Sequence, residues 1–277
     1  MTTRIVTDST CDLPAEVISR YGIRVMPLYI NIGDKGYLDG IEISRRDFYA
    51  NLPTYPTHPT TAAPSPEKFR ELYESLAKEG ATEILSIHIS IALSATLDSA
   101  RGGAKETRSL PVTVFDSRQL SLGMGFLVET AAKLAAQGRS VNEIMPVLEE
   151  QIKRTRVYAA LDTLEFLKRS GRMNGIIAGL GSFLQLKPIL TMYDGKPGAE
   201  RVRTRERATQ RVLQLLRDMG ALERVAILHS NAPDRVAEIR ERAAALLPPD
   251  NVTAVDITPV LGAHIGPGAI GFAAVSK

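Results

Sequence analysis

Short apolar stretches alternate with amphipathic ones along the first part of the chain. Arg4–Thr7, Glu83–Ile89 and Val112–Phe115 have the apolar-rich character of buried strands. Between them lie segments whose apolar residues are three and four positions apart, which is the spacing of helices. The clearest begins at Ser65, a good N-cap residue, and ends at Gly80. This alternation predicts a mostly parallel sheet with helices on its faces.

Shorter elements are predicted between these. Asp12 is the expected N-cap of a short helix that ends at Tyr21, and Ser44 is expected to begin another. Ile23–Ile32 is expected to form one strand. Asn51–Pro66 is rich in proline and threonine and is expected to be a long loop. Loops of this length inside a domain are usually functional or act as linkers.

The pattern changes after about residue 155. Asp194-Gly195 is a strong hairpin signal between two strand-like stretches, with the next three residues lengthening the turn. We therefore predict two α/β domains, residues 1–155 and 156–277, the second with a mixed sheet. Its other predicted elements are strands at 157–161, 224–228, 252–257 and 269–275, helices at 162–172, 175–186, 204–220 and 233–246, and a loop at 262–268.

Composition narrows the class of protein. The 277 residues are 44% hydrophobic and 23% charged, which is typical of a folded globular protein. The net charge is +3, and basic and acidic residues are interspersed, so a solvated surface is favoured over nucleic-acid binding. Cys11 is the only cysteine, which excludes an intrachain disulfide. No signal peptide and no membrane-spanning apolar run is present, so a cytoplasmic location is expected.

Ser90–Thr96 is the stretch that best fits a ligand site. It joins a predicted buried strand to a predicted helix, where open α/β folds bind ligands and where free N–H groups suit an anion. Four histidines, at 58, 88, 229 and 264, show no metal-ligand spacing. His88 and His229 are expected in the core, whereas His264 has small glycine neighbours and steric access. Gly266–Gly271 matches a dinucleotide-binding fingerprint, but only six residues follow it, so we reject that interpretation.

Two arginine positions allow more than one interpretation. Arg172 lies at the end of a predicted helix, where a cation complements the helix dipole. Arg203 belongs to the basic run Arg201–Arg207 between a predicted strand and a predicted helix. That run is either a solvated face or a contact for phosphate or a partner, because the arginine fork matches phosphate oxygens.

The order and spacing of these pieces resemble the DegV family, which includes the fatty-acid-binding subunits of bacterial fatty-acid kinase. The resemblance covers nearly the whole chain. It rests on Val6–Pro14, Tyr37–Gly40, Pro59–Pro66, Ile89–Ser94, Asp116–Gly123, Thr163–Leu167, Gly171-Arg172, Leu186–Leu190, Asp194-Gly195, Val202–Thr204 and Gly262–Gly268.

The resemblance implies a two-domain DegV-like fold with a long acyl tunnel. It implies that a long-chain fatty acid lies there with its carboxylate held by Thr61, Ser94 and His264. It also implies a separate ATP-binding kinase subunit that phosphorylates this carboxylate to an acyl-phosphate. Arg172 and Arg203 would face the phosphoryl group or the partner. No metal or cofactor of the chain's own is expected, and contact with a membrane surface is expected to be transient at most.

The chain departs from the family pattern at four places. Ile91 stands where a serine is common, Ala95 where a glycine is common, Ala62-Ala63 where Ser-Gln is usual, and Ser170 where glycine is usual. The changes at Ile91 and Ala95 fall inside the expected head-group site. We expect the family picture to fit least well there.

The chemistry of such a site leaves alternatives open. Each buried CH₂ of a fatty acid contributes roughly 0.8 kcal/mol, but an unpaired buried carboxylate costs several kcal/mol. Two hydroxyls and a hydrogen bond from His264, partly protonated beside the anion, would pair it without a close arginine or lysine. One alternative is a self-sufficient hydrolase using Ser94 and His264, for which the sequence names no third group. The other is a regulator that binds nucleotide or sugar phosphate through the arginine cluster.

Overall fold

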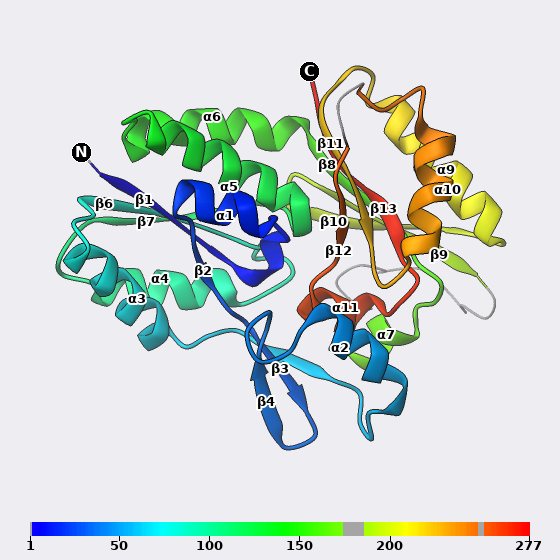
Figure 1. Ribbon diagram of the computed structural model, residues 1–277, viewed down its shortest axis with the longest axis horizontal. Coiled ribbons are helices and arrows are strands. Elements are labelled where there is room, and N and C mark those ends of the chain that lie inside the picture. Colours follow the sequence, from blue (N-terminus) through cyan, green and yellow to red (C-terminus); the bar gives the residue numbers. More distant parts are fainter. Residues whose placement is uncertain (1, 174–185, 249–251) are drawn as a thin grey trace.

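The computed structural model describes residues 2–173, 186–248 and 252–277. Within these residues the strands form three sheets (Figure 1). The first is parallel throughout and has the order β2-β1-β6-β7, which confirms the predicted parallel N-terminal sheet. Its strands are β1 (Thr3–Asp8), β2 (Arg24–Met26), β6 (Glu83–His88) and β7 (Val112–Asp116).

Helices cover both faces of this sheet (Figure 1). One face carries α1 (Ala15–Tyr21), α5 (Ser121–Ala136) and α6 (Val141–Arg154), and the other carries α3 (Pro66–Lys78) and α4 (Thr96–Glu106). The predicted start of α3 is confirmed, because the Ser65 side chain accepts a hydrogen bond from the Lys68 N–H. Gly80 follows that helix with a φ of 89°, a left-handed conformation that suits glycine.

The second sheet has six strands in the order β10-β9-β8-β13-β11-β12. All its pairs are antiparallel except β11 with β12, which confirms the predicted mixed sheet. Helices α9 (Arg205–Asp218) and α10 (Pro233–Ala243) cover its outer face (Figure 1). The strands are β8 (Thr155–Ala160), β9 (Lys187–Tyr193), β10 (Lys196–Val202), β11 (Leu222–His229), β12 (Ala254–Asp256) and β13 (Ile270–Ser276).

The hairpin between β9 and β10 is tighter than predicted. Asp194 and Gly195 have φ values of 45° and 74°, so they form the two-residue turn themselves. Lys196 already pairs with Tyr193. The expectation that the three residues after the turn lengthen it is therefore wrong.

The third sheet, of order β4-β3-β5, projects below the others (Figure 1). Its strands are β3 (Tyr29–Ile32), β4 (Lys35–Leu38) and β5 (Thr60–Ala62). Two predictions fail here. Ile23–Ile32 is not one strand, because Pro27, which lacks an N–H, separates β2 from β3. The Asn51–Pro66 segment is not structureless, because it contains β5 and a short 3-10 helix, η2 (Leu52–Thr54).

Three further predictions about helices and their caps are wrong. Asp12, with a φ of 53°, ends the 3-10 helix η1 (Ser9–Cys11) instead of capping α1. The predicted helix after residue 162 is α7 (Glu165–Arg169), and Asp162 forms ion pairs instead of capping it. The predicted loop at 262–268 is largely helical, as α11 (Pro259–Ile265), whereas α2 (Arg45–Asn51) begins after Ser44 as predicted. The predicted helix at 175–186 falls almost wholly outside the described residues.

The core joins the two halves of the chain. One cluster of buried side chains contains Leu127 and Ile152 from the first half and Val157, Met192 and Leu228 from the second. The split into domains 1–155 and 156–277 stays a prediction.

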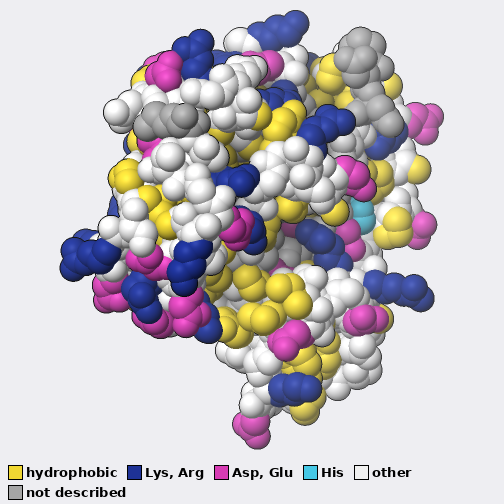
Figure 2. Space-filling view, turned by 60° about the vertical axis from the view of Figure 1, so that its left-hand side comes forward, with side chains coloured by type: hydrophobic (Ala, Val, Ile, Leu, Met, Phe, Trp, Pro, Cys, Tyr) yellow, Lys and Arg dark blue, Asp and Glu magenta, His cyan; other side chains and the backbone are white. Residues whose placement is uncertain are grey.

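Basic and acidic side chains are mixed over the face seen in Figure 2. None of the described helices has the length and apolarity needed to cross a membrane.

Candidate functional site

A cavity of about 310 Å³ lies where the two halves meet. Its wall is mostly apolar: Ile89 and Leu93 follow β6, and Val157, Met192 and Leu228 come from the six-stranded sheet. The volume falls within the range of small-molecule sites, roughly 300–1,000 Å³. The position at the carboxyl end of a parallel strand is the one that the Ser90–Thr96 stretch predicted.

Thr61 and His264 meet at this cavity although 203 residues separate them. The Thr61 Oγ1 atom lies 3.0 Å from His264 Nε2, and both residues line the cavity. Thr61 is held in β5, where it pairs with Ile30 of β3. His264 lies near the end of α11, so a helix, and not the loop expected from its glycine neighbours, fixes its position.

The surroundings of His264 favour its neutral form. Burial, followed by the nearby charges of Arg172 and His58, lowers the pKa of His264 to about 4. The partial protonation expected beside a bound carboxylate stays a prediction. His264 Nδ1 has no hydrogen-bond partner within the described residues. His58, which the sequence did not single out, packs on Phe166 with ring centroids 5.7 Å apart.

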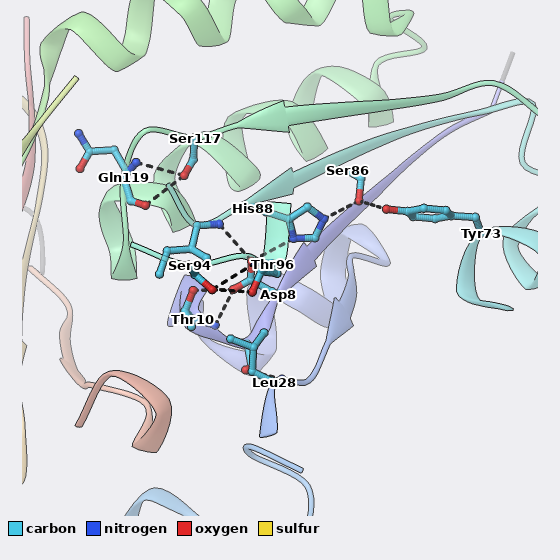
Figure 3. A network of polar contacts seen from close by, with 12 residues as sticks. Asp8, Thr10, Leu28, Tyr73, Ser86, His88, Ser94, Thr96, Ser117 and Gln119 are labelled. Atoms are coloured by element: carbon cyan, nitrogen blue, oxygen red, sulfur yellow. Dashed lines mark hydrogen bonds and ion pairs between the residues drawn. The ribbon is translucent and has the colours of Figure 1, made fainter. Parts of the chain in front are cut away.

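Ser94 lines the same cavity from the segment between β6 and α4 (Figure 3). Its Oγ atom lies 2.9 Å from Thr96 Oγ1 and accepts the Thr96 N–H at 3.3 Å. Of the two departures from the family pattern, Ala95 also lines the cavity, whereas Ile91 is 45% exposed and does not. No separate signal in the sequence identified Thr96 as a partner of Ser94.

Of the two arginines that the sequence singled out, one lines the cavity and the other does not. Arg172 lines the cavity with Thr61, Ser94 and His264, so the expectation of no close cation is wrong. Its side chain donates a hydrogen bond to the Ser170 carbonyl oxygen at 3.1 Å. Arg203 is exposed just after β10 and is not part of the cavity wall.

A buried polar cluster anchors the start of α11. Asp12 Oδ1 accepts the Thr258 N–H at 2.9 Å, and Asp39 Oδ2 accepts the Thr258 hydroxyl at 2.6 Å. Arg45 donates to Asp12 at 3.0 Å, and Ser121, which lines the cavity, donates to it at 2.6 Å. Burial raises the pKa of Asp39 to about 6 and also raises that of Asp12. This cluster fixes the helix that carries His264.

A second buried network explains His88 (Figure 3). His88 Nδ1 lies 3.0 Å from Asp8, its Nε2 lies 2.7 Å from Ser86 Oγ, and Ser86 bonds to the Tyr73 hydroxyl at 2.8 Å. All four residues are fully buried, as expected for a core histidine. The set has the composition of a Ser-His-Asp triad, but no substrate can reach Ser86, which does not line the cavity.

The hydrolase alternative lacks its third group at the cavity. In the described part of the chain, no carboxylate bonds to His264 to orient its ring, because Nδ1 is unpaired and Nε2 faces Thr61. Nor do residues 2–173, 186–248 and 252–277 bring three or more His, Cys, Asp or Glu side chains together in a way that could hold a metal ion. What the cavity offers is hydroxyl, imidazole and guanidinium groups at the edge of an apolar space.

Comparisons with known proteins agree on one family. The chain matches the family described as "Uncharacterised protein, DegV family" over residues 2–277. It is 36% identical to a DegV domain-containing protein of Streptomyces coelicolor, over 99% of this chain and 98% of that protein. It is 34% identical to Protein DegV of Bacillus subtilis, over 98% of each.

Two solved structures share the whole fold. A DegV family protein from Thermus thermophilus, described by its fatty acid binding, is 37% identical with a TM-score of 0.90. DegV from Bacillus subtilis, described as a fatty acid binding protein, is 33% identical with a TM-score of 0.92. Each comparison covers 100% of both chains. The α/β fold with one parallel and one mixed sheet is thus that of known DegV structures.

Proposed function

The chain belongs to the DegV family, and from this premise we propose that it binds a long-chain fatty acid in the cavity between its sheets. The carboxylate is held by Thr61, Ser94 and His264. The observation that carries the proposal is that these three polar side chains, from distant segments, line one mostly apolar cavity. The fatty acid binding described for the Thermus thermophilus and Bacillus subtilis proteins supports it.

The cavity matches the two parts of such a ligand. Each CH₂ group of the tail that leaves water contributes roughly 0.8 kcal/mol. The carboxylate needs donors, since burying it unpaired costs several kcal/mol. A neutral His264 with its proton on Nε2 donates to Thr61 Oγ1, so it acts on the carboxylate through Thr61, whose hydroxyl proton is left for the ligand. The positive charge of Arg172 adds a favourable potential for an anion.

We further propose that a separate kinase subunit, which binds ATP, uses the held carboxylate as its nucleophile. A carboxylate oxygen attacks the γ-phosphorus, the bond from that phosphorus to the β-phosphate oxygen breaks, and ADP leaves with an acyl-phosphate still in the cavity. Arg172 lies at the cavity wall and would stabilise the phosphoryl charge. Arg203, exposed and outside the cavity, suits contact with the partner. Dependence on ATP is consistent with the expected cytoplasmic location.

Mass spectrometry of an organic extract tests lipid binding directly. Protein purified from a lipid-rich host is expected to release about one fatty acid per chain, and its absence would contradict the proposal. After removal of lipid, Ser94→Ala and His264→Ala should bind added fatty acid more weakly. Ser75→Ala is the matched control, because the Ser75 hydroxyl bonds within α3 to the Leu72 carbonyl oxygen.

The kinase step has its own test. Lipid-loaded protein mixed with a DegV-partner kinase subunit and ATP should yield an acyl-phosphate, detected by trapping with hydroxylamine. Arg172→Gln should lose product while still binding fatty acid. If the organic extract contains fatty acid but this assay yields no acyl-phosphate, lipid binding still stands and the kinase step is contradicted.

A further inference from the structure

The hydroxyl of Ser94 has a buried neighbour that no ligand can touch. Thr96, the first residue of α4, is fully buried, whereas Ser94 is half-buried at the cavity. Figure 3 shows their hydroxyls meeting, with 2.9 Å between the oxygens. The Thr96 N–H also donates to Ser94 Oγ, at 3.3 Å. Ser94 Oγ is therefore contacted twice from the side of the protein interior.

Counting protons decides which hydroxyl donates. A hydroxyl has one proton and two lone pairs. If Ser94 donated to Thr96, the proton of the enclosed Thr96 hydroxyl would be left without an acceptor, which is costly for a buried group. If Thr96 donates instead, Ser94 Oγ accepts both the O–H and the N–H of Thr96. The hydroxyl proton of Ser94 is then not used within the protein and can point into the cavity.

We propose that Thr96 is a positioning residue of the head-group site: its hydroxyl donates to Ser94 Oγ and thereby directs the Ser94 proton to a bound carboxylate. This inference rests on the proposed fatty acid binding. The other hydroxyl of the site is arranged in the same way, because Thr61 Oγ1 lies 3.0 Å from the ring nitrogen of His264. Each hydroxyl that faces the ligand thus has a donor from the protein beside it, and hydrogen bonds in such chains strengthen one another.

The test compares three variants in delipidated protein by calorimetric titration with palmitate. Thr96→Val has the same shape but lacks the hydroxyl, and should bind palmitate about tenfold more weakly. Thr96→Ser keeps the hydroxyl and should stay within twofold of the unmodified protein. Thr107→Val is the matched control: it removes a buried hydroxyl from the other end of α4, where Thr107 donates to the Gly103 carbonyl oxygen at 2.9 Å. It should also stay within twofold.

A double-mutant cycle separates positioning from general destabilisation. In a Ser94→Ala background, Thr96→Val should cause no further loss of affinity, because the proton that it positions is gone. Equal losses in both backgrounds, or unchanged affinity in Thr96→Val, would overturn the proposal. Thr96→Ala serves in the same cycle if the valine variant does not fold. If the unmodified protein binds palmitate tightly and the Thr96 variants bind it equally well, this inference alone is rejected. If the unmodified protein does not bind palmitate, the proposed function is rejected as well.

Discussion

Replacing Asp39 by asparagine should change how the stability of this protein depends on pH. Asp39 is buried beside Thr258, whose hydroxyl donates to it at 2.6 Å, and its Oδ1 has no partner in the described residues. Burial is the largest cause of its raised pKa, and the neighbouring Asp12 adds to it, while Arg45 and the nearby hydroxyls of Ser9 and Thr258 oppose it. Asparagine keeps an oxygen for the Thr258 hydroxyl but has no charge to bury.

The size of the effect follows from the pKa. The pKa of Asp39 rises from its ordinary value of 3.8 to about 6, which corresponds to roughly 3 kcal/mol. The folded protein binds this proton more tightly than the unfolded chain does. The stability that the protonated group contributes is therefore fully present below about pH 4 and is lost as the pH rises through 6. The asparagine variant does not undergo this loss.

Denaturant unfolding at a series of pH values measures the difference. Other carboxyl groups titrate in both proteins, so the quantity of interest is the free energy of unfolding of Asp39→Asn minus that of the unmodified protein. It should rise by about 3 kcal/mol between pH 4 and pH 8. Asp34→Asn, which removes a carboxyl group from the exposed turn between β3 and β4, is the matched control. A flat difference for Asp39→Asn would refute the argument from burial.

Other consequences of the structure can be tested with single changes. Gly271→Ala should cost at least about 3 kcal/mol in denaturant unfolding, because its Cβ would overlap the carbonyl oxygen of Tyr158 in the paired strand. Gly33→Ala, in open space but with a φ of 58°, should cost only about 1 kcal/mol, and equal losses would contradict the steric explanation. Arg172→Gln should raise the pKa of His264 above about 4 in an NMR titration of the imidazole, because the Arg172 charge disfavours protonation. An unchanged titration would show that the Arg172 charge does not contribute.

The parts of the fold that the sequence predicted are those with local signals. Ser65 before Pro66, and Asp194-Gly195, act through their own backbone and side chains, and the structure has a helix and a hairpin there. The predictions of local structure fail where contacts with residues distant in the sequence determine the conformation. Gly262 favours a loop by its intrinsic preference, yet in α11 a Cβ at this position would overlap the Tyr49 ring of α2, so packing requires the glycine inside a helix.

The candidate site shows the same division. Local features singled out the Ser90–Thr96 stretch and His264, but only the family resemblance joined Thr61, Ser94 and His264 in one site, because nothing local in the sequence relates positions 61 and 264. The structure brings them to one cavity through the pairing of β5 with β3 and through the position of α11. The neutral state of His264 could not be predicted either, since it depends on the burial of the ring and on the charge of Arg172 beside it.

Two stretches that carry the family resemblance, Val6–Pro14 and Tyr37–Gly40, contribute nothing to the wall of the cavity. Two of their acidic residues, Asp12 and Asp39, instead accept hydrogen bonds from the N–H and the hydroxyl of Thr258 at the start of α11. That helix has seven residues and carries His264 near its end, beside Thr61. A small shift at the start of the helix would therefore move the His264 ring away from the Thr61 hydroxyl. Residues outside the cavity wall therefore fix where His264 stands. The buried carboxylate of Asp39, which costs stability above about pH 6, is explained by the helix that it holds in place.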